Sequence, residues 1–285
     1  MTRSSLSVAR SFLKWAGGKT RLLPAIRSHV PTETKRLIEP FAGSGAVALN
    51  LDVPTKIIGD ANADVISLFQ IVCRHPRRFI VACSREFVPT TNNSAAYAER
   101  RAEFNASRDP FRRACLFVYL NRHGYNGLCR YNRRGEFNVP FGRHTRPYFP
   151  REELRHFAAA LRDATFVRAD FRALLAQAGP GDFVYCDPPY APTADRRDGF
   201  TAYAPGGFSA QDQRDLAEAC RAAAGRGACV LVSNHDTPLI HDLYGDATAI
   251  RRIAVRRSIS RRADRRRPAR ELLITYLPKC ATLER

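Results

Sequence analysis

The chain has 285 residues and a formal net charge of +19, and 45% of its residues are hydrophobic. This length allows one large domain, or a catalytic domain with an insert, around a sizeable core. No segment has the form of a signal peptide or could cross a bilayer, and the eight cysteines contain no CxxC pair. We therefore expect a cytoplasmic protein with reduced cysteines and no metal site.

The positive charge is concentrated in two segments. Residues 100–146 contain eleven arginines against three acids, a net of +8, and residues 251–270 contain ten arginines against one acid, a net of +9. The rest of the chain carries only +2. A bias towards arginine is one explanation, but it does not account for the segregation. A nucleic-acid partner does, because neutralising phosphates releases counterions.

The first recognisable unit is residues 37–51, which read as a strand, a glycine-containing turn and a helix. Gly43 and Gly45 would let the backbone pass close to a ligand that faces the helix N-terminus. Residues 56–60 read as a second strand that ends in Asp60, where nucleotide sites place a carboxylate for ribose hydroxyls. The glycine pattern is incomplete, so an ordinary tight turn is an equal alternative.

Three helical patterns follow, over 64–79, 95–107 and 111–123. Residues 124–148 then alternate aromatic, polar and basic side chains, with a hairpin signal at 133–135. Aromatic rings can stack on bases and arginine can read guanine, so we interpret this segment as a nucleic-acid contact hairpin on a helical insert. A hairpin that packs on its helices with arginines in solvent is the alternative.

An α/β pattern resumes after Pro150. It predicts helices at 151–161, 171–177 and 209–225, and strands at 165–168, 183–186, 228–233 and 272–277. Residues 191–207 and 258–270 have the composition of mobile loops. The fold class is therefore α/β, with a catalytic domain of residues 1–62 and 150–285 that is interrupted by a recognition insert of residues 63–149.

The tetrapeptide Asp187-Pro188-Pro189-Tyr190 follows the apolar strand at 183–186, where α/β sheets bind ligands. An amine on a base is a poor nucleophile because its lone pair is delocalised, so a catalyst must hold it by bonds that favour a tetrahedral nitrogen. Asp187 can accept one hydrogen bond from the amine. The carbonyl of Pro188, held rigidly by the two prolines, can accept a second, and the ring of Tyr190 can stack on the base. The motif therefore predicts amino-group methylation, with a simple strand-end turn as the alternative.

Three motifs in chain order make the sequence resemble the Dam-type DNA adenine methyltransferases: Phe12–Lys19, Glu39–Gly45 and Asp187–Tyr190. The likeness continues through residues 119–143 and Ser233–Asp236, and covers almost the whole chain. It implies a Rossmann-like methyltransferase sheet with an inserted, mainly helical DNA-recognition domain that carries a β-hairpin. It also implies S-adenosyl-L-methionine as methyl donor, adenine in duplex GATC as target, and base flipping.

The resemblance also implies roles for single residues. The catalytic residues are then Asp187, Pro188, Pro189 and Tyr190. The donor site is then lined by Trp15, Lys19, Glu39, Phe41, Ala42, Gly43, Ser44, Gly45, Asp60 and Asp187. The DNA contacts are then made by Lys14, Asn121, Arg122, Tyr125, Asn126, Leu128, Arg130, Pro140, Arg143 and His144.

Within the DNA-contact set, Tyr125 resembles the aromatic residue that enters the duplex beside the target. Arg130 resembles the guanine reader, and Pro140 resembles an apolar contact to thymine. His144 stands where a tyrosine is usual, which puts a recognition or backbone contact there in doubt. We expect a monomer that is associated with the nucleoid through its DNA.

Several rival activities remain open. Cytosine amino-group methylation typically uses Ser at position 187, and RNA or protein-glutamine methylation usually uses Asn. Ring-carbon methylation needs a cysteine nucleophile, but strand alternation points Cys186 to the opposite face from Asp187. The last rival is a DNA-binding module without activity. The sequence does not distinguish roles in replication, mismatch repair, regulation or protection from a nuclease.

Overall fold

A single mixed sheet organises the protein, which we describe from a computed structural model at residues 8–191, 207–255 and 269–278. The strands of this part lie in the order β3-β2-β1-β4-β5-β7-β6. Strands β1 to β5 are parallel, and β7 runs antiparallel to both β5 and β6. The strands are β1 Arg36–Glu39, β2 Thr55–Asp60, β3 Thr165–Arg168, β4 Asp182–Cys186, β5 Cys229–His235, β6 Ala249–Val255 and β7 Ala269–Tyr276.

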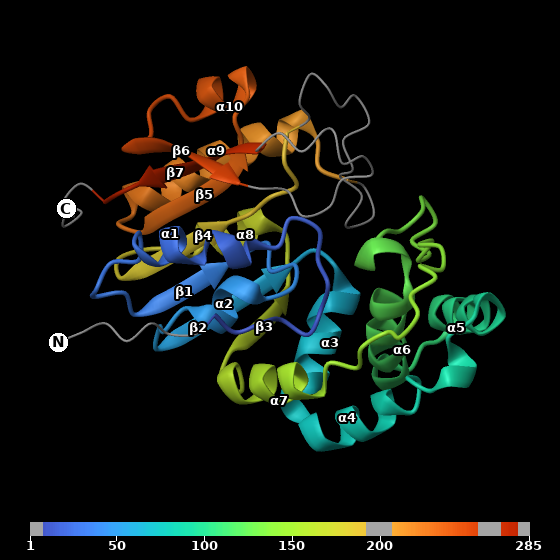
Figure 1. The fold of residues 1–285 in the computed structure, drawn as a ribbon. Coiled ribbons are helices and arrows are strands. Elements are labelled where there is room, and N and C mark those ends of the chain that lie inside the picture. The colour runs from blue at the N-terminus through green and yellow to red at the C-terminus, as the bar shows by residue number, and fades with distance from the viewer. Residues whose placement is uncertain (1–7, 192–206, 256–268, 279–285) are drawn as a thin grey trace.

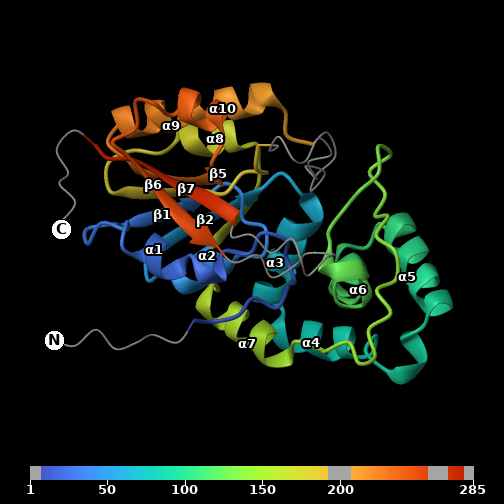
Figure 2. The same cartoon turned by 45° about the horizontal axis from the view of Figure 1, so that its top comes forward.

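Helices cover both faces of this sheet, as Figures 1 and 2 show. Alternate residues of β4 enter two separate hydrophobic cores. Phe183 and Tyr185 belong to the first core, and Val184 and Cys186 belong to the second. The helices are α1 Leu23–Arg27, α2 Ala46–Asn50, α3 Ala63–Arg74, α4 Pro76–Ser84, α5 Ser94–Ala106, α6 Pro110–His123, α7 Arg151–Ala160, α8 Phe171–Ala176, α9 Ala210–Gly225 and α10 Pro238–Leu243. The predicted buried parallel strand before Asp187 is thus confirmed.

The order in which the chain adds strands to the sheet reverses between the parallel neighbours β1 and β4. The chain proceeds from β1 to β2 and β3 on one side, and from β4 to β5 on the other. In α/β folds the crevice outside the carboxyl ends of such strands is where ligands bind. The turn after β1 and the motif after β4 both leave the sheet at this crevice.

One predicted helix is wrong, and one strand was not predicted. The single helix expected at 64–79 is two helices, α3 and α4, separated at His75, whose φ of −134° is not helical. The break follows from Pro76, which has no N–H and restricts the residue before it. Strand β6 was not predicted, because its two arginines interrupt the apolar pattern.

The segment between β2 and β3 contains α3 to α7. Helix α6 is its centre, because every residue from Ala114 to His123 is buried and the helix packs against α3, α4 and α5. The chain after α6 reverses at Gly135, whose φ is +75°. Its pairing consists of two isolated bridges, Gly124 to Phe141 and Tyr131 to Phe137, so the predicted hairpin is not a regular two-stranded ribbon.

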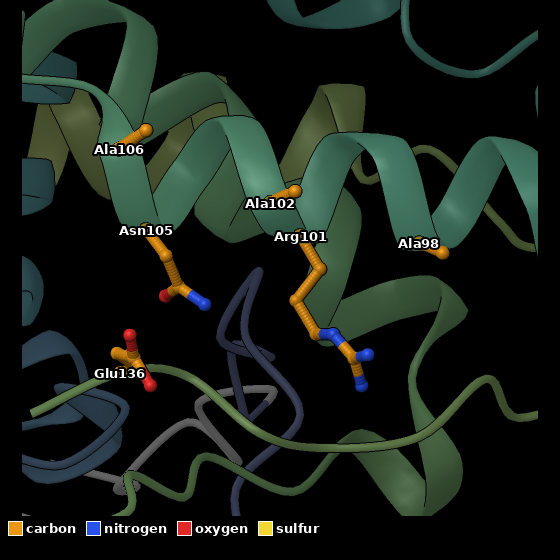
Figure 3. A pocket seen from close by; sticks show the side chains of 6 residues that line it. All are labelled: Ala98, Arg101, Ala102, Asn105, Ala106 and Glu136. Atoms are coloured by element: carbon orange, nitrogen blue, oxygen red, sulfur yellow. The ribbon is translucent and has the colours of Figure 1, made fainter. Parts of the chain in front are cut away.

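Helix α5 supports this reversing segment. The Asn105 side chain accepts a bond from Phe137 N at 2.8 Å and donates to Phe137 O at 3.1 Å, and Arg101 donates to Val139 O at 3.2 Å. Beside these bonds is a shallow depression of about 440 Å³ (Figure 3). It is lined by Ala98, Arg101, Ala102, Asn105, Ala106 and Glu136. None of the residues of the crevice lines it.

The loops expected at 191–207 and 258–270 lie almost entirely outside the described residues. They stay predictions.

Gly59 of β2 has no room for a side chain, because a Cβ atom there would lie 2.2 Å from Leu174 Cδ1. We expect Gly59→Ala to lower the free energy of unfolding by about 1–3 kcal/mol, since Leu174 must leave its rotamer. Gly225→Ala, at the end of α9 where nothing lies within 4 Å, is the control and should be neutral or slightly stabilising. Urea unfolding of both variants checks this, and equal midpoints would contradict it.

Candidate active site

Asp187 lies at the exit of β4, and its carboxylate is held by two side chains from distant parts of the sequence. Lys19 Nζ lies 2.8 Å from Asp187 Oδ1, and Ser233 Oγ donates to the same oxygen at 2.9 Å. The hydroxyls of Tyr185 and Ser233 are 3.0 Å apart. Burial raises the pKa of Asp187, while Lys19 and Ser233 oppose the rise. The result is an oriented carboxylate whose side chain keeps 21% of its surface accessible.

The ring of Tyr190 is held by a contact with another ring and by a hydrogen bond at its hydroxyl. His235 packs edge-on against it with centroids 4.6 Å apart, and its hydroxyl donates to Glu271 Oε2 at 2.8 Å. His235 and Glu271 are opposite each other in the β5–β7 pairing, so one register places both. Lys19 Nζ lies 4.7 Å from the ring centroid, a cation–π geometry. A nitrogen donor thus lies against both the carboxylate of Asp187 and the ring of Tyr190.

Cys186 faces away from this site. It is fully buried in the second core with Val184, whereas Ser233, to which the Tyr185 hydroxyl bonds, contacts the Asp187 carboxylate. Burial also raises the pKa of its thiol well above the usual value. The predicted opposite orientation is confirmed, and Cys186 cannot serve as the nucleophile of ring-carbon methylation.

The glycine turn after β1 is tied to the end of β2. Gly43 N donates to Asp60 Oδ2 at 3.0 Å, and Asn62 N donates to Asp60 Oδ1 at 2.8 Å. Gly43 and Gly45 have φ values of +50° and +69°, which favour glycine. A Cβ atom on Gly43 would lie 2.7 Å from Trp15 Nε1, so the indole rests directly on this turn. Trp15, Gly43 and Asp60 therefore come together as the sequence predicted.

Glu39 lies under the same turn and is almost fully buried. Its Oε2 accepts a hydrogen bond from Ala48 N at 3.0 Å. Burial raises the pKa of Glu39 to about 8, and the charges of Asp187 and Asp60 add to the rise. Glu39 is therefore mostly protonated at neutral pH. Burial likewise raises the pKa of Asp60, against its two backbone hydrogen bonds.

The other predicted donor-site residues complete this wall. Phe41 stacks on Phe171 at 5.4 Å and meets the edge of Phe208 at 5.8 Å. Ala42 N donates to Gly59 O at 2.9 Å, and Ser44, which is buried, accepts a bond at its carbonyl from Ser11. Aromatic rings, backbone amides and carboxylates thus lie together around the turn after β1 and the end of β2.

The predicted DNA contacts divide into two groups. Asn121 is 1% exposed, and its amide pairs with both backbone groups of Lys14 at 2.9 and 2.8 Å. Arg122 is also buried and donates to Phe12 O. In this structure both residues attach the N-terminal motif to α6. The other members are exposed or half-buried: Lys14, Tyr125, Asn126, Leu128, Arg130, Pro140, Arg143 and His144.

Two of the exposed members have unusual backbone conformations. Asn126 and Arg143 have φ values of +54° and +53°, which non-glycine residues rarely adopt. Arg130 is held by Asn138, which accepts bonds at 2.7 and 3.0 Å, and His144 Nε2 lies 3.3 Å from Gly124 O. Strained residues of this kind concentrate at ligand-contact and switch regions.

The sequence reasoning missed several residues of the site. The motif Ser233–Asp236 was recognised without a role, although Ser233 and His235 contact Asp187 and Tyr190. Glu271, Phe171 and Phe208 gave no sequence signal, because pairing and packing alone bring them to the site. Neither metal-binding group nor membrane-spanning helix occurs among the described residues.

Comparison with known proteins agrees with this geometry. Residues 15–259 match the family of D12 class N6 adenine-specific DNA methyltransferases. The chain belongs to this family. It is 48% identical over 269 residues to the DNA adenine methylase of Escherichia coli K12, covering 94% of this chain and 96% of the relative.

Relatives in other bacteria are similar to the same extent. The DNA adenine methylase of Serratia marcescens is 49% identical over 268 residues, covering 94% of this chain and 98% of the relative. That of Vibrio cholerae El Tor is 43% identical over 270 residues, covering 94% and 96%. The protein is therefore a DNA adenine methyltransferase, and the resemblance found in the sequence is confirmed.

Protonation of Glu39 should be visible as a pH dependence of stability. Its pKa of about 8 in the folded protein lies above the ordinary carboxyl value, so its stabilising contribution is complete at low pH and is lost as pH rises through about 8. Glu39→Gln keeps the acceptor for Ala48 N and has no proton to lose. From about pH 6 to about pH 9, the urea midpoint should fall more for the parent than for the variant.

Glu218→Gln, on the exposed face of α9, is the matched control and should keep the slope of the parent. Parallel curves for the parent and Glu39→Gln would show that Glu39 is already ionised at the lower pH.

Proposed function

We propose that the protein transfers a methyl group from S-adenosyl-L-methionine to the exocyclic amine of adenine in duplex GATC, acting as a monomer on a base flipped out of the helix. The observation that carries this proposal is the arrangement of Asp187 and Tyr190, against which the Lys19 ammonium already lies. The target amine would use the same carboxylate and the same ring. The adenine methyltransferase family supports the choice of base.

The crevice fits the proposed donor. The turn at Gly43 leaves no space for a side chain under Trp15, so the backbone can approach a ligand closely. Asp60 would accept bonds from ribose hydroxyls, since a carboxylate that already accepts two backbone bonds has free lone pairs. Phe41, with Phe171 beside it, would supply an apolar wall for the adenine ring. Trp15, Lys19, Glu39, Ala42, Ser44 and Gly45 would complete the donor site, together with Asp187.

The chemistry follows from how the amine is held. The Asp187 carboxylate and the Pro188 carbonyl would each accept one amine hydrogen, which directs the nitrogen lone pair at the methyl group. When bound, the donor supplies an electrophilic methyl on a sulfonium, and the electrons of the broken C–S bond return to sulfur as the N–C bond forms. Asp187 then receives the proton that the nitrogen must lose and passes it to solvent. Most of the rate would come from positioning and fixed dipoles.

Residues 63–149 would form the DNA-recognition insert on the catalytic parts 1–62 and 150–285. A base in a duplex cannot reach Asp187, so it must leave the stack. Tyr125 would enter the duplex beside the target, with Asn126 and Leu128 flanking it. Arg130 would read a guanine through the donors that Asn138 leaves free, and Pro140 would contact thymine. Lys14, Arg143 and His144 would make further base or backbone contacts.

The test of this proposal is transfer of labelled methyl from S-adenosyl-L-methionine to matched duplexes that contain GATC or a single-base variant of it. Label confined to the adenine of GATC is the expected result. Label in another sequence would overturn the target, and absence of both label and donor binding would overturn the donor.

Asp187→Ala should lower kcat by at least about 10²–10³-fold, because it removes an acceptor that orients the amine in the transition state. Binding of duplex DNA should remain substantial, since that surface lies on other residues. Asp163→Ala removes an exposed carboxylate, with 83% of its side chain accessible, and should leave kcat unchanged. Single-turnover methylation and DNA binding are the measurements, and near-normal turnover by Asp187→Ala would refute the role given to this residue.

A further inference from the structure

A buried pair of amides braces the proposed catalytic loop from Pro189 to Ala191. Gln213 of α9 is 3% exposed and Asn234 of β5 is fully buried. Gln213 Nε2 donates to Pro189 O at 2.9 Å, and Asn234 Nδ2 donates to Gln213 Oε1 at 3.0 Å. Asn234 Oδ1 accepts from Ala191 N at 3.2 Å. The two amides therefore span the loop from Pro189 to Ala191.

The orientation of both amides follows from the backbone. Asn234 Oδ1 faces two N–H donors, those of Ala191 and His235, so the oxygen cannot exchange places with the nitrogen. Its Nδ2 must then donate to Gln213, which requires Gln213 Oε1 on that side. The remaining Nε2 of Gln213 faces the Pro189 carbonyl as a donor. Each group in this chain has one possible role.

This bracing acts on the freedom that the two prolines leave. Their rings fix φ at Pro188 and Pro189, so rotation about ψ is the main motion that remains in the loop. The bond at Pro189 O restrains ψ of Pro189, and the bond at Ala191 N restrains the far end. The Tyr190 ring lies between these two bonds, and the Pro188 carbonyl lies just before the first of them. The Pro188 oxygen accepts no bond from the described residues.

We propose that Gln213 is a positioning residue for methyl transfer: its side-chain amide, oriented by Asn234, sets the direction of the Pro188 carbonyl and the Tyr190 ring toward the target amine. The inference rests on the proposed function, which gives these two groups their role. Gln213 itself touches neither base nor donor. Its effect is therefore on the rate of the chemical step.

Replacement by glutamate separates positioning from simple packing. In Gln213→Glu, one carboxylate oxygen still accepts from Asn234, but the other faces the Pro189 carbonyl with no hydrogen to donate. Protonation restores the donor, and burial favours the protonated form. The ratio of kcat for Gln213→Glu to kcat for the parent should fall by about 10- to 100-fold at high pH, and should recover as pH is lowered.

Two further variants are compared with Gln213→Glu. Gln213→Leu cannot donate at any pH, so its kcat ratio should stay low throughout. Gln211→Glu makes the same chemical change on the exposed face of α9, two residues away, and should match the parent. The affinity for S-adenosyl-L-methionine and the melting temperature are measured alongside. If kcat, the affinity for S-adenosyl-L-methionine and the melting temperature of Gln213→Glu all fall, and fall equally at every pH, Gln213 has only a structural role and the proposal is wrong.

The substrate is unmethylated genomic DNA, so that the comparison does not require GATC to be the target. If the parent labels another sequence, the proposed target fails while the kcat ratios still test Gln213. A readout without turnover is hydrogen exchange of the Ala191 amide, which should be faster in Gln213→Leu and unchanged in Gln211→Glu. Unchanged exchange in Gln213→Leu, or kcat within twofold of the parent at every pH, overturns the proposal.

Discussion

The ion pair between Asp187 and Lys19 is the interaction on which the rest of the site depends. A carboxylate whose pKa is raised by burial needs a nearby cation to remain ionised, and that cation comes from a segment more than a hundred residues away. The N-terminal motif must therefore be held in place for Asp187 to stay ionised. Lys19 is itself 6% exposed, and its second bond, to Gly17 O at 2.7 Å, fixes the ammonium.

Helix α6 supplies the support for this motif. Asn121 and Arg122, near its C-terminus, bond to the backbone of Lys14 and Phe12. The strained turn at Asn126 begins directly after the same helix, with Gly127 packed against the Lys14 side chain. One rigid element thus carries both the proposed base-contact segment and the anchor of the N-terminal motif that contains Lys19.

Much of this site could be predicted because its signals are local. A buried apolar run fixed the exit of Asp187, and positive φ at Gly43 follows from a glycine turn between a strand and a helix. The partners of these groups depend on tertiary structure. Glu271 reaches Tyr190 only through the β5–β7 register, and Gln213 reaches Pro189 only because α9 packs beside β5. Asn121 carried a polar motif signal that did not distinguish a surface contact from a buried brace.

The electrostatics of the crevice oppose those of the whole chain. The protein carries a net charge of +19, yet the carboxyl groups of Glu39, Asp60 and Asp187 lie close together. Burial and the charges of Asp187 and Asp60 together raise the pKa of Glu39. Protonation of Glu39 limits their mutual repulsion, and the Lys19 ammonium pairs with the carboxylate of Asp187. The sulfonium of the proposed donor would be favoured inside such a crevice, and the polyanionic duplex would be favoured at the basic exterior. The charge distribution would therefore direct the proposed donor and the DNA to different places without a contact specific to either.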